Sequence, residues 1–278
     1  MIDLHTHTTA SDGRRTPPEL VACAAAAGVT VLSVTDHDTM AACAPAQQAC
    51  ARAGIEFVPG IEITAIRAER DVHVLGYFID VESAALLAFL SDQRKRRLER
   101  VRQVILRLGL CGIDLDAGAI LQPAIDDPAR AVGRPWVARA LVEHGCCATI
   151  GEAFDRWLSR GRPAYVARPA APPEEVVARI HEAGGVASIA HPVLLGHDEW
   201  IPDFVSSGLD AIEAYHTRHD PERTTHYLSL AARLGVAVSG GSDYHADDAY
   251  GALTPGSVAL PPEQFATLKA RRRTNPDS

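Results

Sequence analysis

Two histidines separated by one residue stand near the start of the chain, in the stretch Asp3-Leu4-His5-Thr6-His7. The apolar residues Ile2 and Leu4 predict a strand here, and side chains two residues apart on a strand point to the same face. His5 and His7 would therefore present two imidazoles together, and the carboxylate of Asp12 follows shortly after. Imidazole nitrogens and a carboxylate are suitable ligands for a divalent metal ion. A pair of surface histidines would have the same spacing.

Further side chains that can bind metals follow apolar stretches along the chain. Together with the first three they are His5, His7, Asp12, His37, Glu62, His73, His191, Asp243 and His245. Single positions have ordinary explanations, since His73 could be a buried strand residue and Asp243 a turn residue. One ion takes only about four to six ligands, so this set suits two or three ions that share a bridging carboxylate. Without cations, so many polar groups in one place would be costly to bury.

The elements that must position these side chains alternate between strand and helix. β-Branched stretches such as Val29 to Thr35 predict buried strands, and stretches that begin with proline and end with glycine predict helices. Near Glu62 we expect a strand that is interrupted by Pro59-Gly60. Counting gives about seven strands, which is typical of a parallel β/α barrel. The carboxyl ends of parallel barrel strands form one face, so the candidate ligands would converge there.

The pattern changes after Ser83, where a long helical stretch runs to about Leu108. Its basic run, Arg94 to Arg102, is interpreted as a solvent-exposed helix face, with a nucleic-acid contact as the alternative. Short helices and loops are predicted next, with helix starts at Gly133-Arg134-Pro135 and at the capping box of 149–152. We therefore expect a barrel formed by residues 1–99 and 171–278. A helical insertion, residues 100–170, would cap the active site.

The composition excludes several classes of protein. The chain has 278 residues, 47% of them hydrophobic, and a net charge of -8, which argues against binding to long nucleic acids. No apolar run approaches membrane-spanning length and no signal peptide is apparent, so we expect a cytoplasmic protein without a membrane partner. The six cysteines include no C-x-x-C pair and are predicted to be reduced thiols. Nothing indicates an obligate protein partner.

The candidate ligands lie in motifs that resemble, in the same order along the chain, those of the PHP family (polymerase and histidinol phosphatase domain). The motifs are His5-Thr6-His7, Ser11-Asp12-Gly13, Thr35-Asp36-His37-Asp38, Gly60-Ile61-Glu62, His73, Ala190-His191-Pro192 and Gly241-Ser242-Asp243-Tyr244-His245. The match covers residues 1–80 and 172–250, and it implies a distorted seven-stranded (β/α)7 barrel with a site for three divalent metal ions. Mn²⁺ is the expected ion, and Fe²⁺ or Zn²⁺ would also suit these ligands.

The resemblance also implies how the ions share their ligands. One ion would be held by His5, His7, Glu62 and Asp243, a second by Glu62, His73 and His191, and a third by Asp12, His37 and His245. In this scheme Glu62 bridges two ions.

The insertion is similar to that of the stand-alone bacterial PHP phosphoesterases, which implies a nucleotide or short-RNA substrate. We expect a metal-dependent phosphatase that hydrolyses the 3′-phosphate of nucleoside 3′,5′-bisphosphates, such as adenosine 3′,5′-bisphosphate. The alternatives are a 5′-to-3′ exoribonuclease acting on short 5′-phosphorylated RNA and a histidinol phosphate phosphatase. A non-enzymatic binding module would be expected to have a damaged ligand set, whereas this chain has a full one.

Candidate residues for substrate and catalysis extend beyond the ligands. Asp243 and His216 are the candidate catalytic residues. His216, like the candidate ligands, ends a predicted barrel strand. Arg134 stands at a helix start, where free N–H groups and the helix dipole attract anions, and its guanidinium matches a phosphate. An ordinary surface arginine at a helix start is the alternative. Ser11, Arg160 and His216 are further candidates for the substrate pocket.

Overall fold

Within the part of the chain that the structure describes, seven strands form a single sheet in which the neighbours follow the order of the chain. The computed structural model describes residues 1–168, 170–247 and 254–273. The strands are β1 (Ile2–Asp3), β2 (Val31–Val34), β3 (Glu56–Arg67), β4 (Arg70–Tyr77), β5 (Val186–Ile189), β6 (Ala211–Tyr215) and β7 (Ala237–Gly240). The segments after β1 and β7 meet in a parallel bridge between Thr6 and Tyr244, and the Leu4 amide donates to Gly240 O. The sheet is therefore nearly closed into the predicted distorted barrel.

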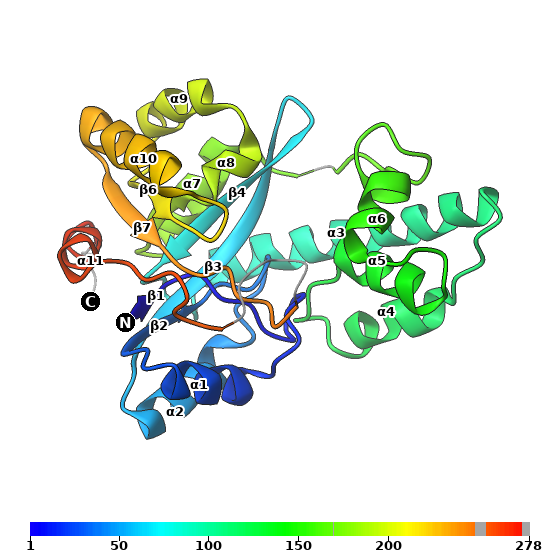
Figure 1. The fold of residues 1–278 in the computed structure, drawn as a ribbon, viewed down its shortest axis with the longest axis horizontal. Helices are drawn as coiled ribbons and strands as arrows, with labels where there is room; N and C mark the ends of the chain where they lie inside the picture. The colour runs from blue at the N-terminus through cyan, green and yellow to red at the C-terminus, as the bar shows by residue number, and fades with distance from the viewer. Residues whose placement is uncertain (169, 248–253, 274–278) are drawn as a thin grey trace.

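The helices fall into two groups in Figure 1. Those around the barrel are α1 (Pro17–Ala26), α2 (Cys43–Ala53), α7 (Pro173–Glu182), α8 (Pro192–Leu195), the 3₁₀-helix η2 (Asp198–Trp200), α9 (Ile201–Ser206), α10 (Pro221–Leu234) and α11 (Pro262–Lys269). Those on the right of the view are α3 (Ala84–Leu110), α4 (Ala117–Asp126), α5 (Arg134–Glu143), α6 (Ile150–Ala153) and the π-helix η1 (Phe154–Leu158). The predicted helix starts at Arg134 and Ile150 are confirmed. No helix in the described ranges is long and apolar enough to span a membrane.

The prediction of a wholly parallel sheet is wrong for β4. This strand is antiparallel to both β3 and β5, whereas the other neighbouring pairs are parallel. Only Ala68 and Glu69 separate β3 from β4, both at positive φ, and such a two-residue turn reverses the chain into a hairpin. His73 consequently lies near the start of β4 and pairs with Thr64 near the end of β3. It still reaches the face on which the other strands end.

The predicted interruption at Pro59-Gly60 is also wrong, because β3 continues through both residues. Pro59 pairs with Val34 of β2 in the parallel register. A Cβ atom on Gly60 would lie 2.2 Å from Ser33 Oγ. Glycine therefore permits a close approach of β3 to β2 here, two residues before Glu62.

Buried apolar side chains form separate clusters in the two groups of elements. One cluster draws on the barrel strands and the helices around them, while another contains only residues between Val101 and Val166. Helix α3 contributes to both, with Leu86 and Leu90 in the barrel cluster and Val104 in the other. The described cysteines are all free thiols. The long helix therefore joins the barrel to the small helical group.

Candidate metal centre

All nine side chains predicted as ligands lie together at one end of the barrel. They form overlapping groups whose potential ligand atoms lie within 4.8 Å of one another. The groups are His7, Asp12, His37 and His245; His5, His216 and Asp243; His5, Glu62 and His191; and His37, Glu62 and His73. His216, predicted as a catalytic and substrate-binding residue, thus joins the same cluster.

Local backbone geometry aims these side chains inward. His5 and His7 point to the same face of the first strand segment, and their ring centroids lie 5.2 Å apart. His191 and Asp243 follow β5 and β7 with φ of 26° and 54°. Residues other than glycine rarely adopt such a conformation, and it often occurs at functional sites. Here it turns each side chain into the cluster immediately after its strand ends.

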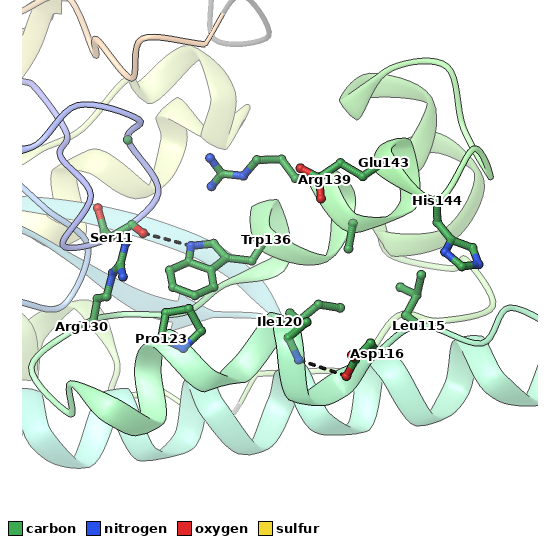
Figure 2. Close-up of a pocket in the computed structure, with 13 residues that line it drawn as sticks. Ser11, Leu115, Asp116, Ile120, Pro123, Arg130, Trp136, Arg139, Glu143 and His144 are labelled. Carbon is green, nitrogen blue, oxygen red and sulfur yellow. Dashed lines mark hydrogen bonds between the residues drawn. The ribbon is translucent and has the colours of Figure 1, made fainter.

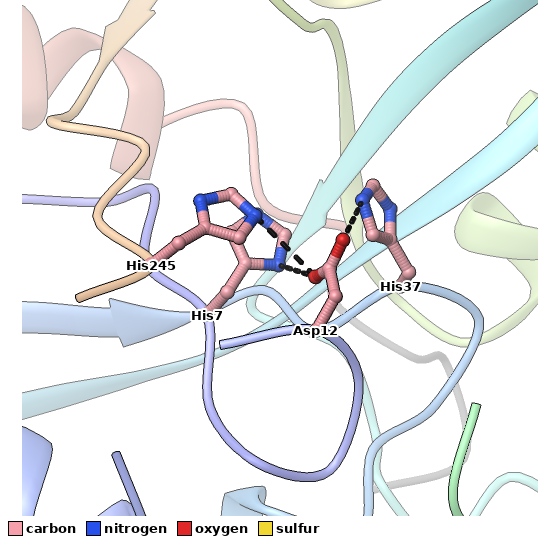
Figure 3. A group of neighbouring side chains, drawn as sticks. All are labelled: His7, Asp12, His37 and His245. Atoms are coloured by element: carbon pink, nitrogen blue, oxygen red, sulfur yellow. Dashed lines mark ion pairs between the residues drawn. The ribbon is translucent and has the colours of Figure 1, made fainter. Parts of the chain in front are cut away.

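Asp12 lies among three histidines from separate segments, as Figure 3 shows. Its Oδ1 lies 3.3 Å from His245 Nε2, and its Oδ2 lies 3.7 Å from His37 Nε2. The rings of His7 and His245 stack with centroids 4.1 Å apart. Burial lowers the pKa of His37 to about 3, so its ring is neutral at pH 7 and has a lone pair to offer.

Glu62 occupies the middle of the cluster and faces histidines with both carboxylate oxygens. Its Oε2 lies 3.2 Å from both His7 Nε2 and His37 Nδ1. Its Oε1 lies 2.6 Å from His73 Nδ1 and 3.1 Å from His191 Nε2. Burial would raise the pKa of Glu62, but the surrounding histidines outweigh burial and hold that pKa well below its usual range. An ionised carboxylate with separate partners on its two oxygens is arranged as a bridging ligand would be.

The cluster fits a metal site on its own geometry. Both ring nitrogens of His7, and Nδ1 of His37, are buried and make no hydrogen bond. Carboxylate oxygens nevertheless lie 3.2 Å from His7 Nε2 and His37 Nδ1. Polar atoms without a hydrogen bond are costly to bury. A cation held among them would bind the imidazole lone pairs and the carboxylates together.

Glu213 lies at the site, and the sequence reasoning missed it. It is fully buried in β6, accepts a hydrogen bond from His5 Nδ1 at 2.9 Å and accepts one from the His191 amide at 2.6 Å. A carboxylate on Nδ1 leaves His5 Nε2 free to bind a metal and orients the ring. The available signal was an acidic residue inside the otherwise apolar stretch that precedes Tyr215.

Asp36 supports the loop that carries Asp12. Its carboxylate accepts hydrogen bonds from the Thr8 hydroxyl and the Ser11 hydroxyl, each at 2.6 Å, and from the Thr8 amide. The Ser11 hydroxyl, a candidate for substrate binding, therefore faces Asp36.

The interpretation of the basic run as a solvent-exposed face is wrong for Arg97 and Arg100, which are buried. The Asp38 carboxylate accepts hydrogen bonds from Arg97 and from Arg168. Burial would raise the pKa of Asp38, but these two guanidinium charges outweigh burial and keep that pKa well below its usual range. The residue after His37 is thereby tied to α3 and to the segment before α7.

A basic cleft of about 180 Å³ adjoins the cluster. Its walls include His37, His73 and four arginines, which are Arg97, Arg100, Arg134 and Arg168. Arg134 Nη2 donates to Asp71 Oδ2 at 2.8 Å, and Arg100 Nη2 is buried without a hydrogen-bond partner. Cations therefore outnumber carboxylates in this cleft.

A second cavity of about 350 Å³ opens over the cluster itself. Its walls combine cluster residues with the apolar side chains of Ile150, Phe154 and Leu194. His37, His73 and Phe154 line both cavities, so the two adjoin.

The remaining predicted substrate residues lie in different surroundings. His216 Nδ1 accepts from the Arg218 amide, and its Nε2 lies 3.3 Å from Asp243 Oδ2. Arg160 does not join the site, because it makes an exposed 2.7 Å ion pair with Glu69 at the turn between β3 and β4.

A nearly closed mixed barrel with a buried histidine–carboxylate cluster at one end is an arrangement suited to a metal-dependent hydrolase. The PHP domain model matches residues 3–109. A 3′,5′-nucleoside bisphosphate phosphatase of Chromobacterium violaceum is 36% identical over 268 residues, covering 94% of this chain and 93% of that protein. The 5′-3′ exoribonuclease Rnm of Escherichia coli is 34% identical over 250 residues, covering 87% and 84%.

A solved structure extends the likeness to the whole fold. It is provisionally described as a metal-dependent phosphoesterase, comes from Bifidobacterium adolescentis and superposes with a TM-score of 0.88 at 29% identity. The alignment covers 99% of this chain and 98% of that one. The chain belongs to the PHP family, and it is a phosphoester hydrolase.

Proposed function

We propose that this protein removes the 3′-phosphate from nucleoside 3′,5′-bisphosphates, such as adenosine 3′,5′-bisphosphate. The observation that carries the proposal is the basic cleft beside the histidine–carboxylate cluster, which offers a second phosphate position. The likeness to the Chromobacterium bisphosphate phosphatase supports the same substrate class. One phosphate would lie at the cluster, the other in the cleft, and the nucleoside in the adjoining apolar cavity.

We further propose that the nine clustered side chains hold three divalent ions, with Mn²⁺ as the expected metal and Glu62 as a bridge. When bound, such ions activate water by lowering its pKa from about 15.7 to about 7 and offset charge on the phosphoryl oxygens. Glu213 would hold His5 with Nε2 directed at an ion, as its 2.9 Å hydrogen bond suggests.

His216 and Asp243 are proposed to handle the proton for the leaving ribose oxygen. Because His216 Nδ1 accepts from the Arg218 amide, the proton of the neutral ring stands on Nε2. That atom lies 3.3 Å from Asp243 Oδ2, which would orient it. An imidazole N–H at the cluster can donate its proton to the leaving oxygen as the phosphate ester bond breaks, and the ring would recover a proton from the attacking water.

Residues 100–170 are proposed to act as an insertion that covers the active site. Three residues from α6 and η1, namely Ile150, Gly151 and Phe154, line the cavity over the cluster. Closing an apolar wall over the site would exclude bulk water and strengthen the electrostatic interactions inside it.

The test of this function compares kcat/KM on a panel of substrates, following phosphate release from the monoesters and mononucleotide release from the RNA. The panel contains adenosine 3′,5′-bisphosphate, the 3′- and 5′-monophosphates, a short 5′-phosphorylated RNA and histidinol phosphate. We expect the bisphosphate to be preferred, because the remote 5′-phosphate contributes binding energy to the reaction. Equal rates on the bisphosphate and the 3′-monophosphate, or release of the 5′-phosphate, would contradict the proposal.

A second candidate is 5′-to-3′ exoribonuclease activity, favoured by the likeness to the Escherichia coli exoribonuclease Rnm. It would use the same hydrolytic centre on a phosphodiester. A much higher kcat/KM on the 5′-phosphorylated RNA, with mononucleotides as successive products, would establish this alternative. A preference for histidinol phosphate would exclude both.

Arg134 is proposed to hold the 5′-phosphate, and Arg134→Ala tests this role directly. A hydrogen bond to a charged group is worth about 1.5–3 kcal/mol, so KM for the bisphosphate should rise by about one to two orders of magnitude. The same variant should leave KM for the 3′-monophosphate unchanged, because that substrate lacks the group that Arg134 contacts. Arg102→Ala is the matched control, since Arg102 is exposed and pairs with Glu99 on α3. Unaltered kinetics of Arg134→Ala on both substrates would disprove the role.

A further inference from the structure

A cavity of about 450 Å³ lies between α4, α5 and the loop that carries Asp12. Ser11 and Gly13 of that loop form part of its wall, and none of the nine proposed ligands lines it. Figure 2 shows Ser11, Arg130 and Trp136 at one end, with Asp116 and His144 at the other. The volume lies within the range of small-molecule sites in proteins, about 300–1,000 Å³.

One face of the Trp136 indole suits a flat ring, since Arg130 lies over the other face with its Cζ 5.3 Å from the ring centroid. The indole of Trp136 is half-buried, donates through Nε1 to Ser11 O at 2.9 Å and thus has a fixed orientation. Leu115, Ile120 and Pro123 complete an apolar surface beside it. Nucleobases stack on indole rings without sequence preference, because each base has a π-face.

Two guanidinium groups stand at the same end. Arg130 Nε donates to Thr9 O at 2.6 Å, and Arg139 donates to Asp12 O through both terminal nitrogens at 3.0 Å. Within the described ranges neither arginine forms an ion pair with a carboxylate, unlike Arg134 and its partner Asp71. A guanidinium has five N–H donors, so both retain donors and full charge for an anion.

Two acidic side chains, Asp116 and the exposed Glu143, also line the cavity, and the one at the other end is already engaged. Asp116 accepts from the Ala119 amide at 3.0 Å and caps the start of α4. The cavity is therefore polarised, with cations and an aromatic ring beside the metal-ligand loop.

We propose that this cavity binds one nucleoside monophosphate unit, with its phosphate at Arg130 and Arg139 and its base against Trp136. The choice of a nucleotide among aromatic anions rests on the proposed function. Two sources share this chemistry: a free mononucleotide, and a neighbouring nucleotide of a short RNA whose end occupies the metal centre.

The test is calorimetric titration of adenosine 5′-monophosphate into chelator-treated protein that carries Arg134→Ala, which removes the proposed active-site phosphate contact. Ala119→Trp should fill the cavity and raise Kd by at least about fivefold, the lower bound for losing a stacked base. Ala117→Trp is the matched control, because residue 117 lies on the same helix, is exposed and does not line the cavity. It should retain the parent affinity.

Arg130→Gln is the second variant and should weaken binding by at least about tenfold through the lost charge. If Ala119→Trp fails to fold, the affinity of Arg130→Gln alone tests whether the cavity binds the nucleotide. Parent affinity in Arg130→Gln, or in a folded Ala119→Trp variant, would overturn the proposal. The titration needs no turnover, so it is independent of the substrate panel that tests the proposed function.

Kinetics with intact Arg134 separate the two sources. If the occupant is part of an RNA substrate, Ala119→Trp raises KM for a 5′-phosphorylated dinucleotide and leaves KM for the bisphosphate unchanged. If it is a free nucleotide, added adenosine 5′-monophosphate alters the rate on a saturating bisphosphate in the Ala117→Trp enzyme but not in Ala119→Trp. Kinetics of Ala119→Trp that match the control on both substrates, with no effect of the nucleotide in either enzyme, would contradict the proposal.

Discussion

At the scale of single residues, Glu62 has contacts that set it apart from the other proposed ligands. Its two oxygens face five histidines at 2.6–3.4 Å, whereas His73 faces Glu62 alone in the described hydrogen bonds. A bridging carboxylate serves two ions at once, so its loss disturbs both.

The first prediction at this scale compares Glu62→Gln with His73→Ala. Glu62→Gln should lose about two equivalents of Mn²⁺ from a wild-type content of about three, because an amide is a poor bridge. His73→Ala should lose about one. Elemental analysis of protein after gel filtration gives the content. A wild-type plateau at one equivalent would rule out a centre of three ions.

Glu213 acts on the centre through its neighbours. Glu213→Gln should retain the fold but lower metal affinity by about 10–100-fold, the usual effect of changing a hydrogen-bond partner of a ligating histidine. Competitive titration with a fluorescent chelator measures the affinity directly. Glu222→Gln, at the exposed start of α10, is the control and should have wild-type affinity. Equal affinities in the two variants would exclude a role for Glu213 in positioning His5.

At the scale of elements, buried ion pairs join the helical group to the barrel. Asp38 follows β2, Arg97 lies on α3, and Arg168 precedes α7, so one carboxylate connects three segments. Burying such an ion pair costs desolvation free energy. Removing one partner destabilises the fold further, because the other charge then stays buried without a partner.

Asp38→Asn should therefore lower the free energy of unfolding at pH 7 by about 3–5 kcal/mol, measured by urea denaturation. The control is Asp92→Asn, whose exposed partner Arg96 lies on the same helix and whose loss should cost about 0–1 kcal/mol. Similar losses in both variants would contradict this account of the interface.

The pH dependence of this difference has a definite sign. The pKa of Asp38 is lower in the folded protein than the value of about 3.9 expected in the unfolded chain. Its stabilising contribution is complete above pH 4 and is lost as the pH falls towards the folded pKa. The stability gap between wild type and Asp38→Asn should therefore narrow below about pH 4.

At the scale of the whole molecule, the metal centre joins segments from both ends of the chain. Its residues come from positions 5 to 245, and they face one another across the end of the barrel. Ions that bind only the folded arrangement stabilise it by mass action.

Removal of metal should therefore lower the melting temperature. At a free Mn²⁺ concentration of about one hundred times Kd, binding adds about 2.7 kcal/mol, which corresponds to several degrees for a protein of this size. Scanning calorimetry with and without chelator measures the shift, and readdition of Mn²⁺ should reverse it. In Glu62→Gln the shift should be smaller. A chelator-independent melting temperature in wild-type protein would contradict a metal centre that stabilises the fold.

Local sequence determined much of this protein by itself. The alternation of β-branched stretches with proline-led helices was enough to predict a seven-stranded barrel, and all nine candidate ligands lie in one cluster. This worked because strand periodicity and helix-boundary residues are local signals, and because ligands that follow parallel strands must meet at one end.

Tertiary structure alone decided the direction of β4, the burial of Arg97 and Arg100, and the role of Glu213. A two-residue turn at Ala68 and Glu69 carries no glycine or asparagine to signal a hairpin. An arginine on an amphipathic helix is usually exposed, and burial of Arg97 becomes favourable through the carboxylate of Asp38, which is distant in sequence. A glutamate inside a strand acquires its function from His5, 208 residues away in the chain. Such long-range electrostatic partners exist only once the fold has brought them together.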